Sequence, residues 1–185
     1  LLNQNPKWIE PLRQEQERVL GGRDELTLDD LRSMFLLEAS VKEALRMYPP
    51  IILMMRRVLE AFDFDGYHIP AETMLMTCPP VAHRISEVFA DPLKFDPERF
   101  MEPREEDKKH AMSWISFGGG RHRCMGIVFA QLQLRAVWSH LLRNFDFELV
   151  ESRYEPDYAR LLVGPRTPCR VRYPRRKTRT SVSVP

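Results

Sequence analysis

A glycine-rich turn that contains a cysteine is the segment best suited to chemistry. Residues 117–126 read Phe-Gly-Gly-Gly-Arg-His-Arg-Cys-Met-Gly, and Cys124 lies just before a stretch with the apolar spacing of a helix. A cysteine that binds a metal must lose its proton, and the positive N-terminal end of a helix favours thiolate over thiol. Backbone N–H groups of the same turn can donate to the sulfur. The sequence therefore predicts a thiolate metal ligand at Cys124.

The neighbours of Cys124 agree with this interpretation. Gly118, Gly119 and Gly120 allow the backbone to turn sharply and to approach a flat macrocycle without a Cβ in the way. We expect Phe117 to shield the ligand from solvent. A phosphate-binding loop is disfavoured because the Lys-Ser/Thr ending is absent, and a zinc site because His122 and Cys124 are too close together. An inert cysteine in a structural loop stays open.

Four segments, in the required order, resemble motifs of the cytochromes P450. The turn has the form Phe117-Gly-x-Gly-x-His-x-Cys-x-Gly126 of that family's haem-ligand signature. Glu43-Ala-Leu-Arg46 resembles its Glu-x-x-Arg helix motif, and Pro97-Glu-Arg-Phe100 the motif whose arginine completes an ion cluster. The long irregular connection at 90–116 resembles the meander. The implied fold is mainly α with small β-sheets, a partial cytochrome P450 fold that lacks the central oxygen-activating helix.

The resemblance implies a haem, iron protoporphyrin IX, with Cys124 as its axial ligand. It places Arg56 and His122 beside the haem carboxylates, although the residues alone leave Arg56 equally well explained as a charge at a strand edge. It also implies a redox partner, a ferredoxin or a reductase, that docks near the turn, with Arg121 and Arg123 as candidate docking charges. The residues that it assigns to cofactor binding are Arg56, Phe117, Gly118, His122, Cys124 and Gly126.

Glu43, Arg46 and Arg99 receive different interpretations from the residues and from the resemblance. Glu43 and Arg46 are three apart on a predicted helix, and an exposed pair at that spacing contributes under about 1 kcal/mol. The resemblance instead implies that both join Arg99 in a buried cluster that fixes the helix to the meander. Removal of one partner would then strand a buried charge and cost roughly 3–5 kcal/mol.

Three stretches resemble the sterol 14α-demethylases more specifically, namely 49–56, 120–124 and 171–176. Ser116 and Gly119 depart from that branch, which usually has Pro and Ala there. By this analogy an apolar sterol, or another apolar small molecule, would meet two segments that ordinary core packing explains as well. Their residues are Ile51, Ile52, Leu53, Met54, Met55, Leu161, Leu162 and Val163.

Helical spacing predicts helices at 6–20, ended by Gly21-Gly22, at 27–48, ended by Pro49-Pro50, and after Gly126. Asp65-Gly66 between apolar runs predicts a hairpin in a small sheet over 51–78. Strand-like stretches follow at 145–150 and 161–173. In the last helix we expect Phe129 and Val137 inside and Arg135 outside, and we expect Cys78 and Cys169 to be buried.

The 185 residues, 43% of them hydrophobic, suit one globular unit over 1–174, followed by a basic tail over 175–185 that we expect to be disordered. Residues 170–185 hold six basic side chains, which leaves 22 basic against 26 acidic groups elsewhere, so nucleic-acid binding is not expected. No run of residues is apolar enough to cross a bilayer. The compartment stays open between the cytoplasm and a cytosol-facing membrane, with any anchor outside the chain.

The sequence as a whole predicts a haem-thiolate monooxygenase, with sterol 14α-demethylation as the expected activity and no turnover expected from this chain alone. Oxidation of other lipids or foreign compounds is the competing activity. A non-catalytic remnant that binds haem weakly is the alternative of a different class.

Overall fold

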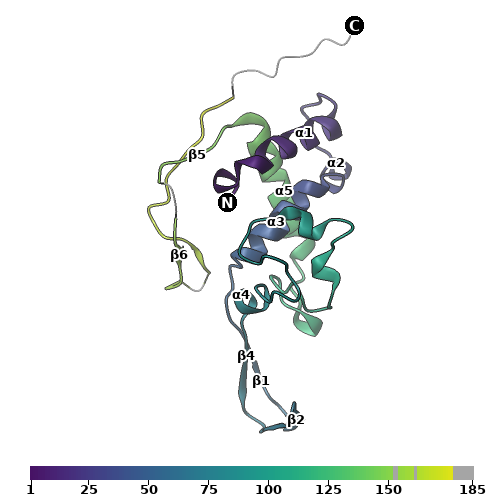
Figure 1. Cartoon of the computed structure of the whole chain (residues 1–185), viewed down its shortest axis with the longest axis vertical. Helices are drawn as coiled ribbons and strands as arrows, with labels where there is room; N and C mark the ends of the chain where they lie inside the picture. The colour runs from purple at the N-terminus through teal and green to yellow at the C-terminus, as the bar shows by residue number, and fades with distance from the viewer. Residues whose placement is uncertain (152–153, 161, 177–185) are drawn as a thin grey trace.

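The computed structural model describes residues 1–151, 154–160 and 162–176. The longer helices lie together, a β-hairpin region projects from them, and the C-terminal stretch runs along one side (Figure 1). The α-helices are α1 (Ile9–Leu20), α2 (Leu28–Arg32), α3 (Phe35–Met47), α4 (Pro79–Ala82) and α5 (Ile127–Asn144). The 3₁₀ turns are η1 (Leu2–Gln4), η2 (Pro6–Trp8), η3 (Pro97–Phe100), η4 (Glu106–Lys108) and η5 (Gly120–His122). The strands are β1 (Met54–Arg57), β2 (Phe62–Phe64), β3 (Tyr67–Ile69), β4 (Met74–Thr77), β5 (Glu148–Leu149), β6 (Pro156–Asp157), β7 (Gly164–Pro165) and β8 (Val171–Arg172).

The hydrophobic core lies between α1, α2, α3 and α5, where removal of apolar side chains from water stabilises the helices. Because α3 packs on both α1 and α5, its position is fixed from two sides. The buried members of this core are Trp8, Leu12, Leu20, Leu31, Met34, Leu37, Phe95 and Leu142.

The first predicted helix is confirmed, and the second is wrong in one respect. Gly21 ends α1 with φ of +56°, a left-handed conformation that glycine adopts without strain. The single helix predicted over 27–48 is instead two helices, α2 and α3, separated at Ser33 and Met34. Glu15 of α1 causes the separation, because its carboxylate accepts the N–H groups of Leu36 and Leu37 at 2.7 and 2.9 Å and so caps a new helix start.

The predicted hairpin is confirmed. Phe64 pairs with Tyr67, and Asp65 and Gly66 between them have φ of +49° and +81°, as a two-residue turn of this kind requires. β1 pairs antiparallel with β4 at the base of the same projection. In the C-terminal stretch β5 pairs with β8, and β6 with β7.

The long final helix is confirmed, but its buried face differs from the predicted one. Arg135 is buried, whereas Phe129 is 71% exposed and Val137 is 48% exposed. Arg135 donates to the carbonyl of Leu31 at 3.1 Å and to Glu38 at 2.7 Å, so the guanidinium is satisfied inside the helical group. Apolar spacing did not identify the packed side because a paired arginine occupies it.

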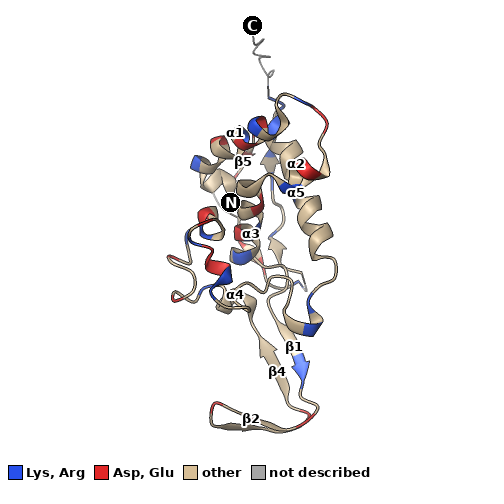
Figure 2. Ribbon diagram, turned by 90° about the vertical axis from the view of Figure 1, so that its right-hand side faces the viewer, with Lys and Arg blue, Asp and Glu red and all other residues tan. Residues whose placement is uncertain are grey.

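Basic and acidic residues are spread over the helical part and the irregular segment, and the projecting region carries them on β1 and in its turns (Figure 2). Of the predicted tail, Arg175 pairs with Phe145, and the N–H of Arg176 donates to Asn144 at 2.9 Å; residues 177–185 lie outside the described part. Cys169 is exposed and Cys78 half-buried, so the prediction that both are buried is wrong. Within the described residues, no helix has the length and apolar character to cross a membrane.

Candidate functional site

The segment from Phe117 to Gly126 forms a closed turn that presents Cys124 at the start of α5. The Cys124 N–H donates to the carbonyl of Phe117 at 2.9 Å, and the Arg123 N–H donates to Gly120 at 3.2 Å. Helix α5 begins at Ile127, three residues after Cys124. The thiol therefore lies beside the positive end of an 18-residue helix, where a negative sulfur is favoured.

Cys124 is exposed, with exposed apolar side chains on the residues that follow it. Met125 is 99% exposed and Phe129 71% exposed, and Val128 is exposed as well. A Cβ on Gly126 would lie 3.7 Å from the Cys124 Sγ, in ordinary contact, so glycine leaves that side of the sulfur uncovered. These surroundings suit a flat apolar group with a metal ion at its centre, to which the thiolate would bind. No group of three or more His, Cys, Asp or Glu within the described residues could hold a bare metal ion.

The glycines of the turn are not equivalent. Gly118 has φ of +76°, so a side chain there would be strained whatever the space. A Cβ on Gly119 would come too close only to the end of Met112, with Sδ at 2.4 Å, and that side chain is exposed and flexible; its contact with Ile115 Cγ2 at 3.7 Å would be ordinary. The backbone therefore requires glycine at 118 and tolerates alanine at 119.

We expect Gly118→Ala to lower the free energy of unfolding by about 1–2 kcal/mol, the cost of a left-handed residue with a Cβ. Gly119→Ala is the matched control and should change it by less than about 0.5 kcal/mol. Denaturant unfolding of both variants measures the difference. Equal losses would contradict the strain at Gly118.

Residues 114–116, here named the anchoring segment, hold the turn against α3 and α4. The Trp114 indole N–H donates to the Lys42 carbonyl at 3.2 Å, and the Ser116 hydroxyl donates to the Leu45 carbonyl at 3.0 Å. Between them the Ile115 N–H donates to the ring of His83 at 2.9 Å. The Trp114 ring also packs on Phe117, with 5.8 Å between centroids. The turn thus inherits its position from α3 and α4.

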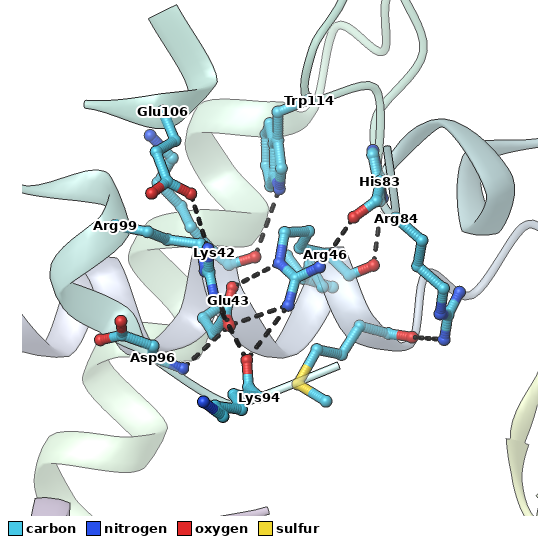
Figure 3. Close-up of polar contacts among 12 residues, drawn as sticks. Lys42, Glu43, Arg46, His83, Arg84, Lys94, Asp96, Arg99, Glu106 and Trp114 are labelled. Carbon is cyan, nitrogen blue, oxygen red and sulfur yellow. Dashed lines mark hydrogen bonds and ion pairs between the residues drawn. The ribbon is translucent and has the colours of Figure 1, made fainter. Parts of the chain in front are cut away.

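Glu43 lies at the centre of a fully buried ion cluster (Figure 3). Its carboxylate accepts from Arg46 Nε and Nη2 at 2.6 and 2.9 Å, from Arg99 Nε at 3.1 Å and from the Asp96 N–H at 2.9 Å. Glu43, Arg46 and Arg99 are all 0% exposed. Four donors on one carboxylate satisfy a buried charge that would otherwise be very costly.

The cluster extends into the irregular segment through Glu106. Arg99 donates to Glu106 at 2.6 Å and to the carbonyl of Ala90 at 2.8 Å, and Arg104 donates to the other Glu106 oxygen at 2.8 Å. Burial by itself would raise the pKa of Glu106, but the hydrogen bonds and charges of Arg104 and Arg99 hold it below its usual value. The cluster therefore joins α3 to the chain that leads into the Cys124 turn.

Arg56 and His122, the candidate partners of the haem carboxylates, lie near the turn, and their side chains are exposed. The Sδ of Met54 lies 3.7 Å from the Cβ position of Gly118, so β1 runs beside the turn. Arg56 shares a strand face with Met54, because side chains alternate along a strand. His122 lies in η5, within the turn itself. Arg121 and Arg123 are exposed on the same turn.

The two predicted substrate-lining segments are brought together. The Val163 N–H donates to the Pro50 carbonyl at 2.8 Å, which places the second segment beside the start of the first. Leu161 lies outside the described residues. The exposed members of the two segments are Ile51, Leu53, Met55 and Leu162, and the half-buried ones are Ile52, Met54 and Val163.

Three contributors were missed by sequence reasoning. His83 has no partner at helical or strand spacing, and its contacts come from residues 37 and 32 positions away. Glu106 belongs to a charged run, which gives no sign that one acid is buried. Ser116, noted only as a departure from proline, donates a hydrogen bond that proline has no donor to make.

Comparisons with known proteins agree with this geometry. The family model described as Cytochrome P450 matches residues 1–171. A sterol 14alpha-demethylase of Mycolicibacterium vanbaalenii is 37% identical over 177 residues, which cover 95% of this chain and 39% of that protein. A sterol 14-demethylase of Arabidopsis thaliana is 45% identical over 170 residues, covering 88% and 35%. An obtusifoliol 14-alpha demethylase of Triticum aestivum is 40% identical over 183 residues, covering 96% and 40%.

A solved structure is similar as well. The retinoic acid-bound cyanobacterial CYP120A1 superposes with a TM-score of 0.87 at 29% sequence identity, over 94% of this chain and 40% of that one. The chain thus spans 35–40% of the length of these relatives. The predicted fold class, mainly α with small sheets and part of a larger fold, is confirmed.

Proposed function

This chain belongs to the cytochrome P450 family, and we propose that Cys124 is the thiolate ligand of a haem iron in a monooxygenase. The family implies haem with a cysteine ligand. Cys124 is our choice because it alone among Cys78, Cys124 and Cys169 lies in a glycine turn at the start of a long helix. That placement is the observation that carries the proposal.

The residues around Cys124 fit the cofactor. The start of α5 favours the thiolate, the glycine turn leaves space, and the apolar surface of Met125 and Phe129 keeps water from the sulfur once it is covered. Arg56 and His122 would hold the haem carboxylates. When bound, the haem supplies the oxygen chemistry, and the chain supplies ligation and orientation.

The decisive change is Cys124→Ser, with Cys169→Ser as the control, since both thiols are exposed. We expect the chain reconstituted with haem to show the red-shifted Soret band of thiolate ligation when reduced under carbon monoxide. Cys169→Ser should keep that band, and Cys124→Ser should lose it, because an alcohol does not replace the thiolate at neutral pH. Persistence of the band in Cys124→Ser would overturn the proposal, and its absence from the unchanged chain would favour a non-catalytic remnant.

For the substrate we propose a 14α-methyl sterol. The support is the similarity to sterol 14-demethylases of bacteria and plants and the apolar segment 51–55, whose methionines adapt to irregular shapes. The alternative is another apolar lipid, which the likeness to the retinoic acid-bound structure favours. Difference spectra of the haem-loaded protein, recorded as a sterol or retinoic acid is added, separate the two. We expect no turnover from the 185 residues alone.

We also propose that an electron-donating partner docks beside the turn. Arg121 and Arg123 are exposed there, on a segment that ends at the proposed ligand. Exposed charges act mainly on the rate of association and are screened by salt. Reduction by a ferredoxin that does not slow as ionic strength rises would argue against these two arginines.

A further inference from the structure

His83 is a buried histidine that contacts both the ion cluster and the anchoring segment. It follows α4 directly and is 0% exposed. Its Nδ1 lies 3.1 Å from the Arg46 carbonyl, and its Nε2 lies 2.9 Å from the Ile115 backbone nitrogen. Its own carbonyl accepts from the Arg46 guanidinium at 2.7 Å (Figure 3). The imidazole therefore bridges α3 and residue 115.

The two ring contacts specify one protonation state. The Arg46 carbonyl can only accept a hydrogen bond, so Nδ1 must carry the proton. The Ile115 N–H can only donate, so Nε2 must be unprotonated. The neutral Nδ1–H imidazole satisfies both partners. A second proton on the ring would set two donors against each other at Nε2 and leave the Ile115 N–H buried without an acceptor.

The surroundings also favour the neutral ring. Burial lowers the pKa of His83 to about 4, and the positive charges of Arg46 and Arg84 act in the same direction against the hydrogen bond to the Arg46 carbonyl. The Phe89 ring meets the imidazole edge-on at 6.3 Å. The hydrogen bonds of the ring within the described residues go to backbone groups, the Arg46 carbonyl and the Ile115 N–H. The neutral form is therefore present throughout the physiological range.

A short series of backbone bonds leads from His83 to Cys124. The Ile115 carbonyl accepts from the Gly118 N–H at 2.9 Å, and the Phe117 carbonyl accepts from the Cys124 N–H at 2.9 Å. Ile115 is buried, so its N–H has no access to water if His83 is lost. The orientation of Ile115, whose carbonyl binds the turn at Gly118, therefore depends on the acceptor at His83 Nε2.

We propose that His83 is a positioning residue for the Cys124 turn, and that it acts through the Ile115 N–H as the neutral imidazole protonated on Nδ1. Its effect on the metal rests on the proposed ligand role of Cys124. Its effect on the position of the turn does not.

The tautomer can be tested without a substitution. We expect ¹⁵N NMR of the unchanged chain at pH 7 to show His83 protonated on Nδ1 and bare on Nε2. The exposed His110 provides the reference within the same sample. A proton on Nε2 at pH 7 would overturn the proposal, because Ile115 would then have no acceptor.

Two substitutions distinguish the hydrogen bond of Nδ1 from that of Nε2. His83→Gln can place an amide oxygen near Nε2 and so keeps an acceptor for Ile115. His83→Asn is shorter and can keep a donor to the Arg46 carbonyl, but leaves Ile115 unpaired. We expect the amide-exchange protection of Ile115 to fall about tenfold or more in the Asn variant, the cost of an unsatisfied buried donor, and to stay within a few-fold in the Gln variant.

Equal loss of protection in the two variants would mean that His83 fills space only, and would overturn the proposal. The same substitutions at exposed His110 should change nothing. After haem is added, the share of protein with the thiolate carbonyl band should fall in the order unchanged, Gln, Asn. If the unchanged chain shows no such band, the ligand proposal fails while Ile115 exchange still decides the role of His83.

Discussion

Glu43→Gln is expected to lower the free energy of unfolding by roughly 3–5 kcal/mol. The substitution keeps the size of the side chain but replaces a carboxylate oxygen by an amide group that donates. Arg46 and Arg99 are both 0% exposed and would lose their shared counter-charge, and the Asp96 N–H would lose its acceptor or gain a neutral one. A buried guanidinium without a counter-charge is the main cost. Urea unfolding at pH 7 measures it.

A matched ion pair elsewhere in the chain controls for the loss of one charge. Asp29 and Arg32 have the same three-residue helical spacing, with contacting atoms 3.2 Å apart, but their side chains are 89% and 64% exposed. Water solvates both charges, so Asp29→Asn should cost under about 1 kcal/mol. If the two substitutions cost the same, burial of the cluster does not determine its contribution. In haem-loaded protein, Glu43→Gln should also release haem faster, because the cluster fixes the segment that leads to Cys124.

Acidification from pH 7 to pH 4 is expected to remove about 3 kcal/mol of stability through His83 alone. Its pKa is lowered from 6.5 to about 4 by burial, so the unfolded chain binds the proton more readily than the folded chain between these values. Stability from this group is complete above pH 6.5 and is lost as the pH falls toward 4. The magnitude follows from 1.36 kcal/mol for each pKa unit.

The difference between two profiles of unfolding free energy against pH isolates the contribution of His83. Other groups also titrate in this range; burial raises the pKa of Glu15, for example, which acts with the opposite sign. Subtracting the unfolding free energies of His83→Gln from those of the unchanged chain at each pH cancels such groups, because glutamine does not titrate. A difference that is constant from pH 7 to pH 4 would show that His83 does not titrate with a lowered pKa.

Features that depend on neighbouring residues were predicted from the sequence, and features that depend on distant partners were not. Gly21 at the end of α1, the Asp65-Gly66 hairpin and the helix after Gly126 were all predicted, because each depends on neighbours within a few positions. The break between α2 and α3 was missed, because its cause is Glu15, which is more than twenty positions from the backbone groups that it caps. Periodicity carries no information on such a partner.

The sequence also did not predict which polar residues are buried. Arg135 and His83 are buried because each finds partners from a distant segment, and Glu106 is buried where it pairs with Arg99 and Arg104 of the same irregular segment. Charged side chains are mostly exposed in proteins, so composition does not predict the burial of Arg135 and Glu106. Phe129 and Val137 are the converse case, because their apolar spacing favours burial but they are 71% and 48% exposed. Only the assembled helices decide which charges are paired.

The sequence by itself determined the character of the ligand turn, because glycine, cysteine and the start of a helix are contiguous and their chemistry is local. It also marked Glu43, Arg46 and Arg99 as a set, although only through resemblance. The tertiary structure decided how that turn is held, since the carbonyls of Lys42 and Leu45 and the ring of His83 reach residues 114–116 only after α3, α4 and the irregular segment have packed. A hydrogen bond between segments that are tens of residues apart has no signature along the chain until folding brings donor and acceptor within about 3 Å.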